Sequence, residues 1–174
     1  STAPGSISPI NALFTSTSAT CVTGLIVLDT PHAFTTFGQG VILALIQVGG
    51  LGITVLSTFG AVLLGRGLGL SGEQAMGDLL EIGGSRDAYR LTRFIVATTI
   101  AIEALGATIL TQRYWQGDTP LAEAVWHGVF HAVSAFCNAG FALQTDSLVM
   151  FQEDPVVLAT VSGLVILGGI GFVV

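Results

Sequence analysis

The sequence is poor in charged residues. Only 9% of its 174 residues are Asp, Glu, Lys or Arg, whereas a soluble domain carries about a quarter. It has no lysine, and its basic side chains are five arginines that form no cluster. Because such a chain cannot follow a phosphate backbone, we exclude a nucleic-acid-binding protein.

Cysteine and catalytic motifs are also scarce. The two cysteines, Cys21 and Cys137, lie far apart in apolar surroundings, which argues against a disulfide framework, a zinc site or a thiol enzyme. The hydrolase motif G-x-S-x-G does not occur. The first residues lack the basic start and the apolar core that together mark a signal peptide, and the last residues belong to an apolar run. We therefore expect a fragment of a longer membrane chain.

Apolar residues and glycine dominate the composition. Hydrophobic residues make up 51% of the chain, there are 23 glycines, and mean hydropathy is +0.80. This combination is typical of packed transmembrane helices. Three long apolar runs, about 37–64, 94–110 and 156 to the end, approach the roughly 20 residues that a membrane-crossing helix needs. Glu103 interrupts the second run, so it should face protein or water, either to move ions or as half of a structural pair.

Two shorter apolar segments, Ser8–Cys21 and Thr119–Cys137, begin with a Ser/Thr-Pro pair that suits a helix start. Their helical parts are too short to cross a membrane and too apolar for a solvated loop. We predict re-entrant half-helices that line a watery path.

The arginines predict the orientation. Four of the five lie between the first two runs, which places that connection in the cytoplasm and both half-helices on the outer side. Acidic residues flank the half-helices and would concentrate cations there: Asp29, Asp118, Glu123, Asp146, Glu153 and Asp154.

The chain contains an internal repeat. The pattern S-A-x-C-x-x-G plus a large apolar residue occurs at 18–25 and 134–141, and each copy leads to a GG-x-G segment, at 49–52 and 168–171. An extended loop after a half-helix can turn its carbonyls to a common axis and replace the water shell of a cation. Glycine at the loop end permits the backbone angles that this requires.

These motifs resemble a known family. TSATCVTGL, HAVSAFCNAGF and IQVGGLGI look like the Trk/Ktr/HKT superfamily of potassium transporters. The resemblance implies an all-α transmembrane fold of potassium-channel-like helix–pore-loop–helix units, of which this chain holds parts of two. It implies transport of K⁺, perhaps with Na⁺, no enzyme activity and no organic cofactor. Its filter would comprise Thr20, Cys21, Val22, Thr23, Gly24, Phe136, Cys137, Asn138, Ala139 and Gly140.

The resemblance also implies an organisation and partners. Residues 1–70 would hold the first repeat, 71–88 a cytoplasmic connection and 89–174 the second repeat. The family forms homodimers in the plasma membrane, regulated by a cytoplasmic nucleotide-binding subunit of the Trk A or Ktr A type.

Two alternative functions stay open. Glu123, His127 and His131 share a helix face and suggest a metal site, hence a metal-dependent intramembrane enzyme, although H-E-x-x-H is absent. A purely structural, glycine-packed bundle is another. A G-x-G-x-x-G at 67–72 lacks the preceding strand that a dinucleotide site needs, and we interpret it as a loop. For the GG-x-G glycines we favour close packing over a hinge.

Overall fold

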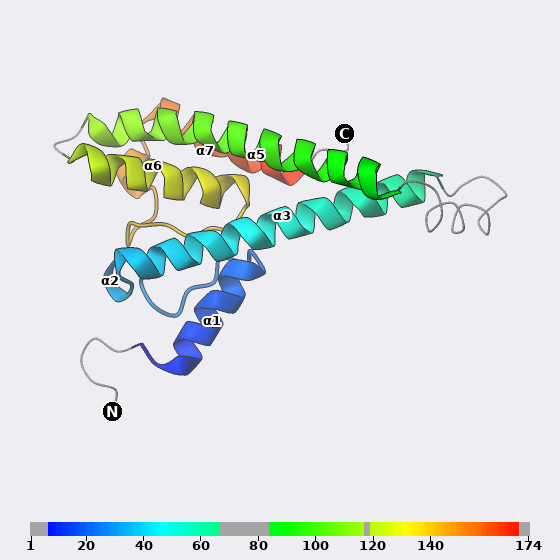
Figure 1. The fold of residues 1–174 in the computed structure, drawn as a ribbon. Helices are drawn as coiled ribbons and strands as arrows, with labels where there is room; N and C mark the ends of the chain where they lie inside the picture. Colours follow the sequence, from blue (N-terminus) through cyan, green and yellow to red (C-terminus); the bar gives the residue numbers. More distant parts are fainter. Residues whose placement is uncertain (1–6, 67–83, 117–118, 171–174) are drawn as a thin grey trace.

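Every element in the described part of the chain is a helix. The computed structural model describes residues 7–66, 84–116 and 119–170 (Figure 1). Its elements are α1 (Pro9–Thr20), α2 (Thr30–Ala33), α3 (Thr36–Arg66), α5 (Gly84–Trp115), α6 (Leu121–Phe136), the 3-10 turn η1 (Val149–Phe151) and α7 (Pro155–Ile170). The prediction of an all-helical fold is confirmed for these residues.

The three predicted apolar runs lie in α3, α5 and α7. Two segments are long and apolar enough to cross a membrane, Thr36–Ile53 in α3 and Thr92–Trp115 in α5. The described part of α7 is shorter, at 16 residues. α5 begins at Gly84, inside the connection predicted at 71–88, because no glycine or proline interrupts 85–93. Residues 71–83 of that connection and the G-x-G-x-x-G glycines lie outside the described residues.

The two predicted half-helices are α1 and α6, of 12 and 16 residues. At about 1.5 Å per residue they reach about 18 and about 24 Å, less than the roughly 30 Å of hydrocarbon. α1 begins as predicted, because Ser8 Oγ accepts the N–H of Asn11 at 3.3 Å and Pro9 occupies the first turn. For α6 the predicted cap is wrong: Pro120 is the N-cap, so Thr119 lies one residue too early and no side chain caps the helix.

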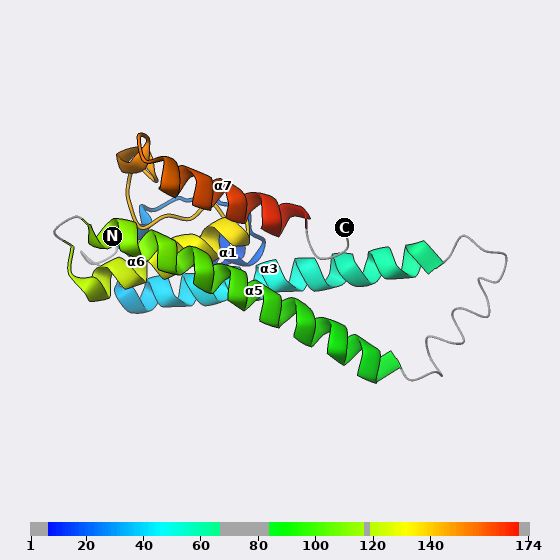
Figure 2. The same ribbon diagram turned by 90° about the horizontal axis from the view of Figure 1, so that it is seen from above.

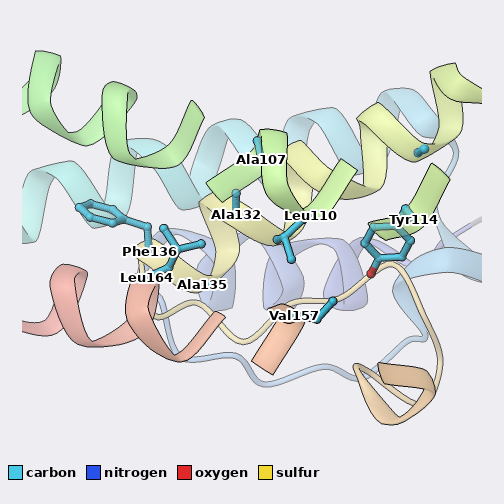
Figure 3. Packing of buried hydrophobic residues seen from close by; sticks show 9 residues of the cluster. Ala107, Leu110, Tyr114, Ala132, Ala135, Phe136, Val157 and Leu164 are labelled. Carbon is cyan, nitrogen blue, oxygen red and sulfur yellow. The ribbon is translucent and has the colours of Figure 1, made fainter. Parts of the chain in front are cut away.

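The second half-helix lies at the centre of the packing. α6 contacts α5, α7 and α3, whereas α1 packs on α3 (Figures 1 and 2). A cluster of buried side chains joins α5, α6 and α7 (Figure 3): Ala107, Leu110, Tyr114, Ala124, Ala132, Ala135, Phe136, Val157 and Leu164. A second cluster joins α1, α3 and α6 to the segment after α6: Ala19, Ile42, Ile46, Phe130, Val133, Ala139, Phe141 and Leu143. The ends of both half-helices are therefore held in the core.

An ion pair joins the end of α5 to the start of α7. Arg113 Nε donates to Asp154 Oδ2 at 2.8 Å, while Asp154 Oδ1 accepts the backbone N–H groups of Val156 and Val157 at 2.9 and 3.3 Å. Partial burial raises the pKa of Asp154, but the hydrogen bonds from Arg113 and from the two amides outweigh it and hold that pKa below the ordinary 3.8. The ionised carboxylate thus stabilises the fold.

We expect Asp154→Asn to lower the melting temperature at neutral pH by a few degrees, because Asn keeps the cap but loses the charge. The folded pKa is depressed, so the stabilisation is complete above pH 3.8 and is lost as the pH falls through the folded value. The difference between wild type and variant should therefore shrink towards low pH. Thermal unfolding measured as a function of pH checks this, and a difference independent of pH would contradict it.

Candidate functional site

The chain leaves α1 and α6 along the same backbone path. After α1, the N–H groups of three successive residues turn back to carbonyls of the last helical turn: Cys21 to Thr17, Val22 to Ala19 and Thr23 to Ser18, at 2.8, 3.2 and 3.0 Å. After α6, the equivalent bonds run from Cys137 to Val133, Asn138 to Ala135 and Ala139 to Ser134, at 2.9, 3.0 and 2.8 Å. The sequence repeat is thus also a repeat of hydrogen bonds.

Two residues of each loop, separated by one position, have left-handed backbone angles. Val22 and Gly24 have φ of 56° and 70°, and Asn138 and Gly140 have φ of 59° and 71°. A β-branched residue such as Val22 rarely adopts a positive φ, so this conformation is strained.

Several carbonyls of the two loops accept no hydrogen bond from the described residues. Within the described residues, no hydrogen bond ends on the carbonyl oxygens at positions 22–24 or 138–140. The N–H groups of Thr23 and Ala139 face the half-helix, and because a trans peptide holds its C=O opposite its N–H, the carbonyl oxygens of Val22 and Asn138 face away from it. A row of oxygens on one side of a loop can coordinate a cation that has lost its water.

The structure brings the two loops together. A Cβ atom added to Gly24 would lie 2.8 Å from the carbonyl oxygen of Ala139 and 3.4 Å from the Cα of Gly140. A cavity of about 310 Å³ lies beside both loops and is lined by Cys21, Val22, Cys137 and Asn138 together with Gly50 of α3 and Gly168 of α7. Residues predicted from separate segments thus lie side by side.

Two of the ten predicted residues face elsewhere. The carbonyl oxygens of Thr20 and Phe136, at the ends of the half-helices, lie against Gly49 of α3 and Gly168 of α7, where a Cβ atom would overlap them. The predicted close packing of these glycines is confirmed. Gly52, by contrast, has no neighbour within 4 Å.

Glu103 is buried within α5 and paired. Its side chain is 6% exposed, its Oε2 accepts Gln47 Nε2 at 3.1 Å, and its Oε1 lies 3.9 Å from Cys137 Sγ. The prediction that Glu103 faces protein is confirmed. The structure supports the structural pair, in which Glu103 bonds to Gln47 and also contacts Cys137 of the second loop.

The histidines of α6 offer no metal site. His131 Nε2 accepts the N–H of Leu143 at 3.3 Å, so its Nδ1 carries the hydrogen and donates to the carbonyl of His127 at 2.8 Å. His127 Nδ1 lies 3.2 Å from Gln144 Nε2, and its Nε2 lies 3.7 Å from Glu123 Oε1. No three His, Cys, Asp or Glu side chains in the described ranges could hold a metal ion. The metal-site alternative is therefore not supported.

Two contacts tie the halves of the chain together. Thr145 Oγ1 donates to Asp29 Oδ2 at 2.7 Å, and Trp126 Nε1 donates to Gln39 Oε1 at 2.9 Å. Hydrogen bonds from Thr145 and His32 hold the pKa of Asp29 below its ordinary value. The hydrogen bond between Thr145 and Asp29 thereby joins the segments that follow the two loops.

Sequence reasoning missed the role of two serines. Ser18 Oγ donates to the carbonyl of Leu25 at 2.7 Å, and Ser134 Oγ donates to the carbonyl of Phe141 at 2.6 Å. Both serines belong to the shared S-A-x-C-x-x-G pattern, and their recurrence was the available signal. From the sequence alone, that recurrence indicated a repeat but not the hydrogen-bond partners of the two serines.

The class of protein follows from a family comparison. A family model described as TrkH, cation transport protein, matches residues 2–174. The chain belongs to this family, which confirms the resemblance stated above. The family is one of transporters, not enzymes, as predicted.

Individual relatives sharpen this assignment. The chain is 41% identical over 171 residues to the Ktr system potassium uptake protein B of Bacillus subtilis, covering 97% of this chain and 38% of the relative. It is 39% identical over 168 residues to the protein of the same name from Vibrio alginolyticus, covering 97% and 37%. The potassium/sodium uptake protein NtpJ of Enterococcus hirae is 36% identical over 165 residues, covering 95% and 36%. The chain therefore spans less than two fifths of the length of these curated relatives.

Proposed function

We propose that this chain forms part of a pore that passes K⁺, with Na⁺ as a secondary ion, through a filter of backbone carbonyls. The observation that carries the proposal is the pair of adjacent loops in which the carbonyls at 22–24 and 138–140 accept no hydrogen bond among the described residues, while those of Val22 and Asn138 point away from their half-helices. Such oxygens replace the hydration shell of a bare cation. The names of the relatives, which are potassium or potassium/sodium uptake proteins, support the choice of ion.

The proposed filter contains the ten residues predicted from the sequence. Its strongest members are Val22–Gly24 and Asn138–Gly140, whose carbonyls are free. Thr20 and Phe136 are the weakest, because their carbonyls lie against glycines of the next helix. Cys21 and Cys137 contribute backbone and line the adjoining cavity.

The proposed architecture consists of helix–pore-loop–helix units in a multi-pass plasma-membrane protein. Residues 1–70 belong to the first repeat, 71–88 to a cytoplasmic connection and 89–174 to the second repeat. The filter needs further repeats to surround an ion, so we propose that the chain works within a longer protein. That protein would be a homodimer with a cytoplasmic nucleotide-binding subunit of the Trk A or Ktr A type, in keeping with the "Ktr system" of two relatives' names.

The test is ion uptake by the full-length protein in cells that lack their own K⁺ uptake systems. We expect wild type to take up K⁺ and Gly140→Ser to reduce K⁺-over-Na⁺ selectivity by about tenfold, equivalent to roughly 1.4 kcal/mol. The reason is that serine is strained at φ of 71° and will turn the filter carbonyl.

Gly163→Ala is the matched control, because nothing lies within 4 Å of that position on α7. Its uptake and selectivity should equal those of wild type. If wild type takes up no K⁺, or if Gly140→Ser keeps wild-type selectivity at equal protein abundance, the loops are packing motifs and the structural-bundle alternative is favoured.

A further inference from the structure

Each half-helix carries one buried serine that reaches past the filter glycine. Ser18 and Ser134 are 4% and 3% exposed. Their hydroxyls donate to the carbonyls of Leu25 and Phe141, the residues directly after Gly24 and Gly140. The two bonds are short, 2.7 and 2.6 Å, and occupy equivalent positions in the two repeats.

These bonds reverse the direction of the carbonyls across the filter glycine. Up to Thr23 and Ala139 the N–H groups bond back to the half-helix, and because a trans peptide holds its C=O opposite its N–H, the carbonyls of Val22 and Asn138 face away from it. The carbonyls of Leu25 and Phe141 instead face the half-helix, because each accepts from a serine on that helix. The peptide that begins at Leu25 or Phe141 is therefore turned over relative to the one that ends at Thr23 or Ala139.

A glycine cannot hold such a reversal by itself. It populates positive and negative φ about equally, so the chain changes direction easily at this point unless another group fixes the residue that follows. In the second repeat, Phe141 is buried, and an unbonded carbonyl there would lose its hydrogen bond without gaining water. The serine hydroxyl is thus the group that fixes the outer end of each loop.

The first repeat has an additional contact at this point. The hydrogen of Ser18 Oγ goes to the carbonyl of Leu25, so Thr23 Oγ1, 2.8 Å away, donates to Ser18 Oγ. Ala139 stands at the equivalent place in the second repeat and has no hydroxyl. Ser134 therefore receives no hydrogen bond from the residue equivalent to Thr23.

We propose that Ser18 and Ser134 are positioning residues. By holding the carbonyls of Leu25 and Phe141, they fix the outer end of the filter and thereby the preference of the filter for K⁺ over Na⁺. The proposal rests on the function proposed above. Because Ser18 is supported by Thr23, Ser134→Ala should have the larger effect of the two alanine substitutions.

The experiment compares Ser18→Ala, Ser134→Ala and Ser134→Thr in the full-length protein, with K⁺ and Na⁺ uptake measured in the same cells. Ser16→Ala is the matched control, since its hydroxyl bonds only to the carbonyl of Leu13 within α1. We expect K⁺-over-Na⁺ selectivity to fall about fivefold in Ser134→Ala, equivalent to roughly 1 kcal/mol. Ser18→Ala should lose less, Ser134→Thr should recover part of the loss, and Ser16→Ala should match wild type.

A second measurement does not depend on uptake. In the purified protein, K⁺ should raise the melting temperature more than Na⁺ does, and this difference should shrink in Ser134→Ala but not in Ser16→Ala. If Gly140→Ser loses selectivity while both serine variants keep it, the positioning role is wrong and the filter assignment stands. If wild type takes up no K⁺, the proposed function fails first.

Discussion

Alanine at Gly49 or Gly168 is expected to prevent stable folding. In each case the added Cβ atom would overlap a backbone carbonyl oxygen, that of Thr20 for Gly49 and that of Phe136 for Gly168. Both oxygens belong to the last turn of a half-helix that is held in the core, so neither can move aside as a flexible side chain could. Overpacking of this kind costs about 3 kcal/mol or more. The measurement is the yield and melting temperature of the purified full-length protein.

The matched controls lie on the same two helices. Gly52 on α3 and Gly163 on α7 have no neighbour within 4 Å, so an added methyl group meets nothing within the described residues. Because alanine favours a helix over glycine by about 1 kcal/mol, Gly52→Ala and Gly163→Ala should be neutral or stabilising. Equal losses at all four positions would mean that the glycines act through helix flexibility and not through close packing.

These glycines also show what local sequence could predict. The apolar runs, the Ser-Pro start of α1 and the GG-x-G segments are local patterns with direct physical meaning, and the structure contains them as far as residue 170. The internal repeat predicted two equivalent loops because the same residue types recur in the same order. Gly24 and Gly140 were identifiable as positive-φ positions for the same reason, whereas the positive φ of Val22 and Asn138 was not.

Contacts between distant segments were not predictable. Glu103 pairs with Gln47 across 56 positions, and Asp29 accepts from Thr145 across 116 positions. No periodicity encodes such pairs, because they depend on how complete helices pack. The prediction of the α6 cap failed for a different reason, since Thr119 and Pro120 fit two helix starts that differ by one residue, and the helix begins after Pro120.

The strongest side-chain effect is expected for His131→Ala. The side chain is 4% exposed and links three parts of the structure. Its Nε2 accepts the N–H of Leu143 in the segment after the second loop, its Nδ1 donates to the carbonyl of His127, and its ring lies beside Tyr114 at a centroid distance of 5.7 Å. Alanine leaves a cavity and an unbonded buried N–H, which together should lower the free energy of unfolding by about 3 kcal/mol.

His32→Ala is the matched control, because the same substitution there removes a side chain that is 79% exposed. It should change the melting temperature much less. His131→Gln should recover part of the loss, since its amide oxygen can accept the N–H of Leu143, whereas no metal ion should restore His131→Ala. If His131→Ala melts like wild type, the segment after the second loop is held by Ser134 and the apolar core alone. If instead added Zn²⁺ stabilises wild type but not His131→Ala, a metal site exists. The assignment of both His131 ring nitrogens to hydrogen bonds with the protein is then wrong.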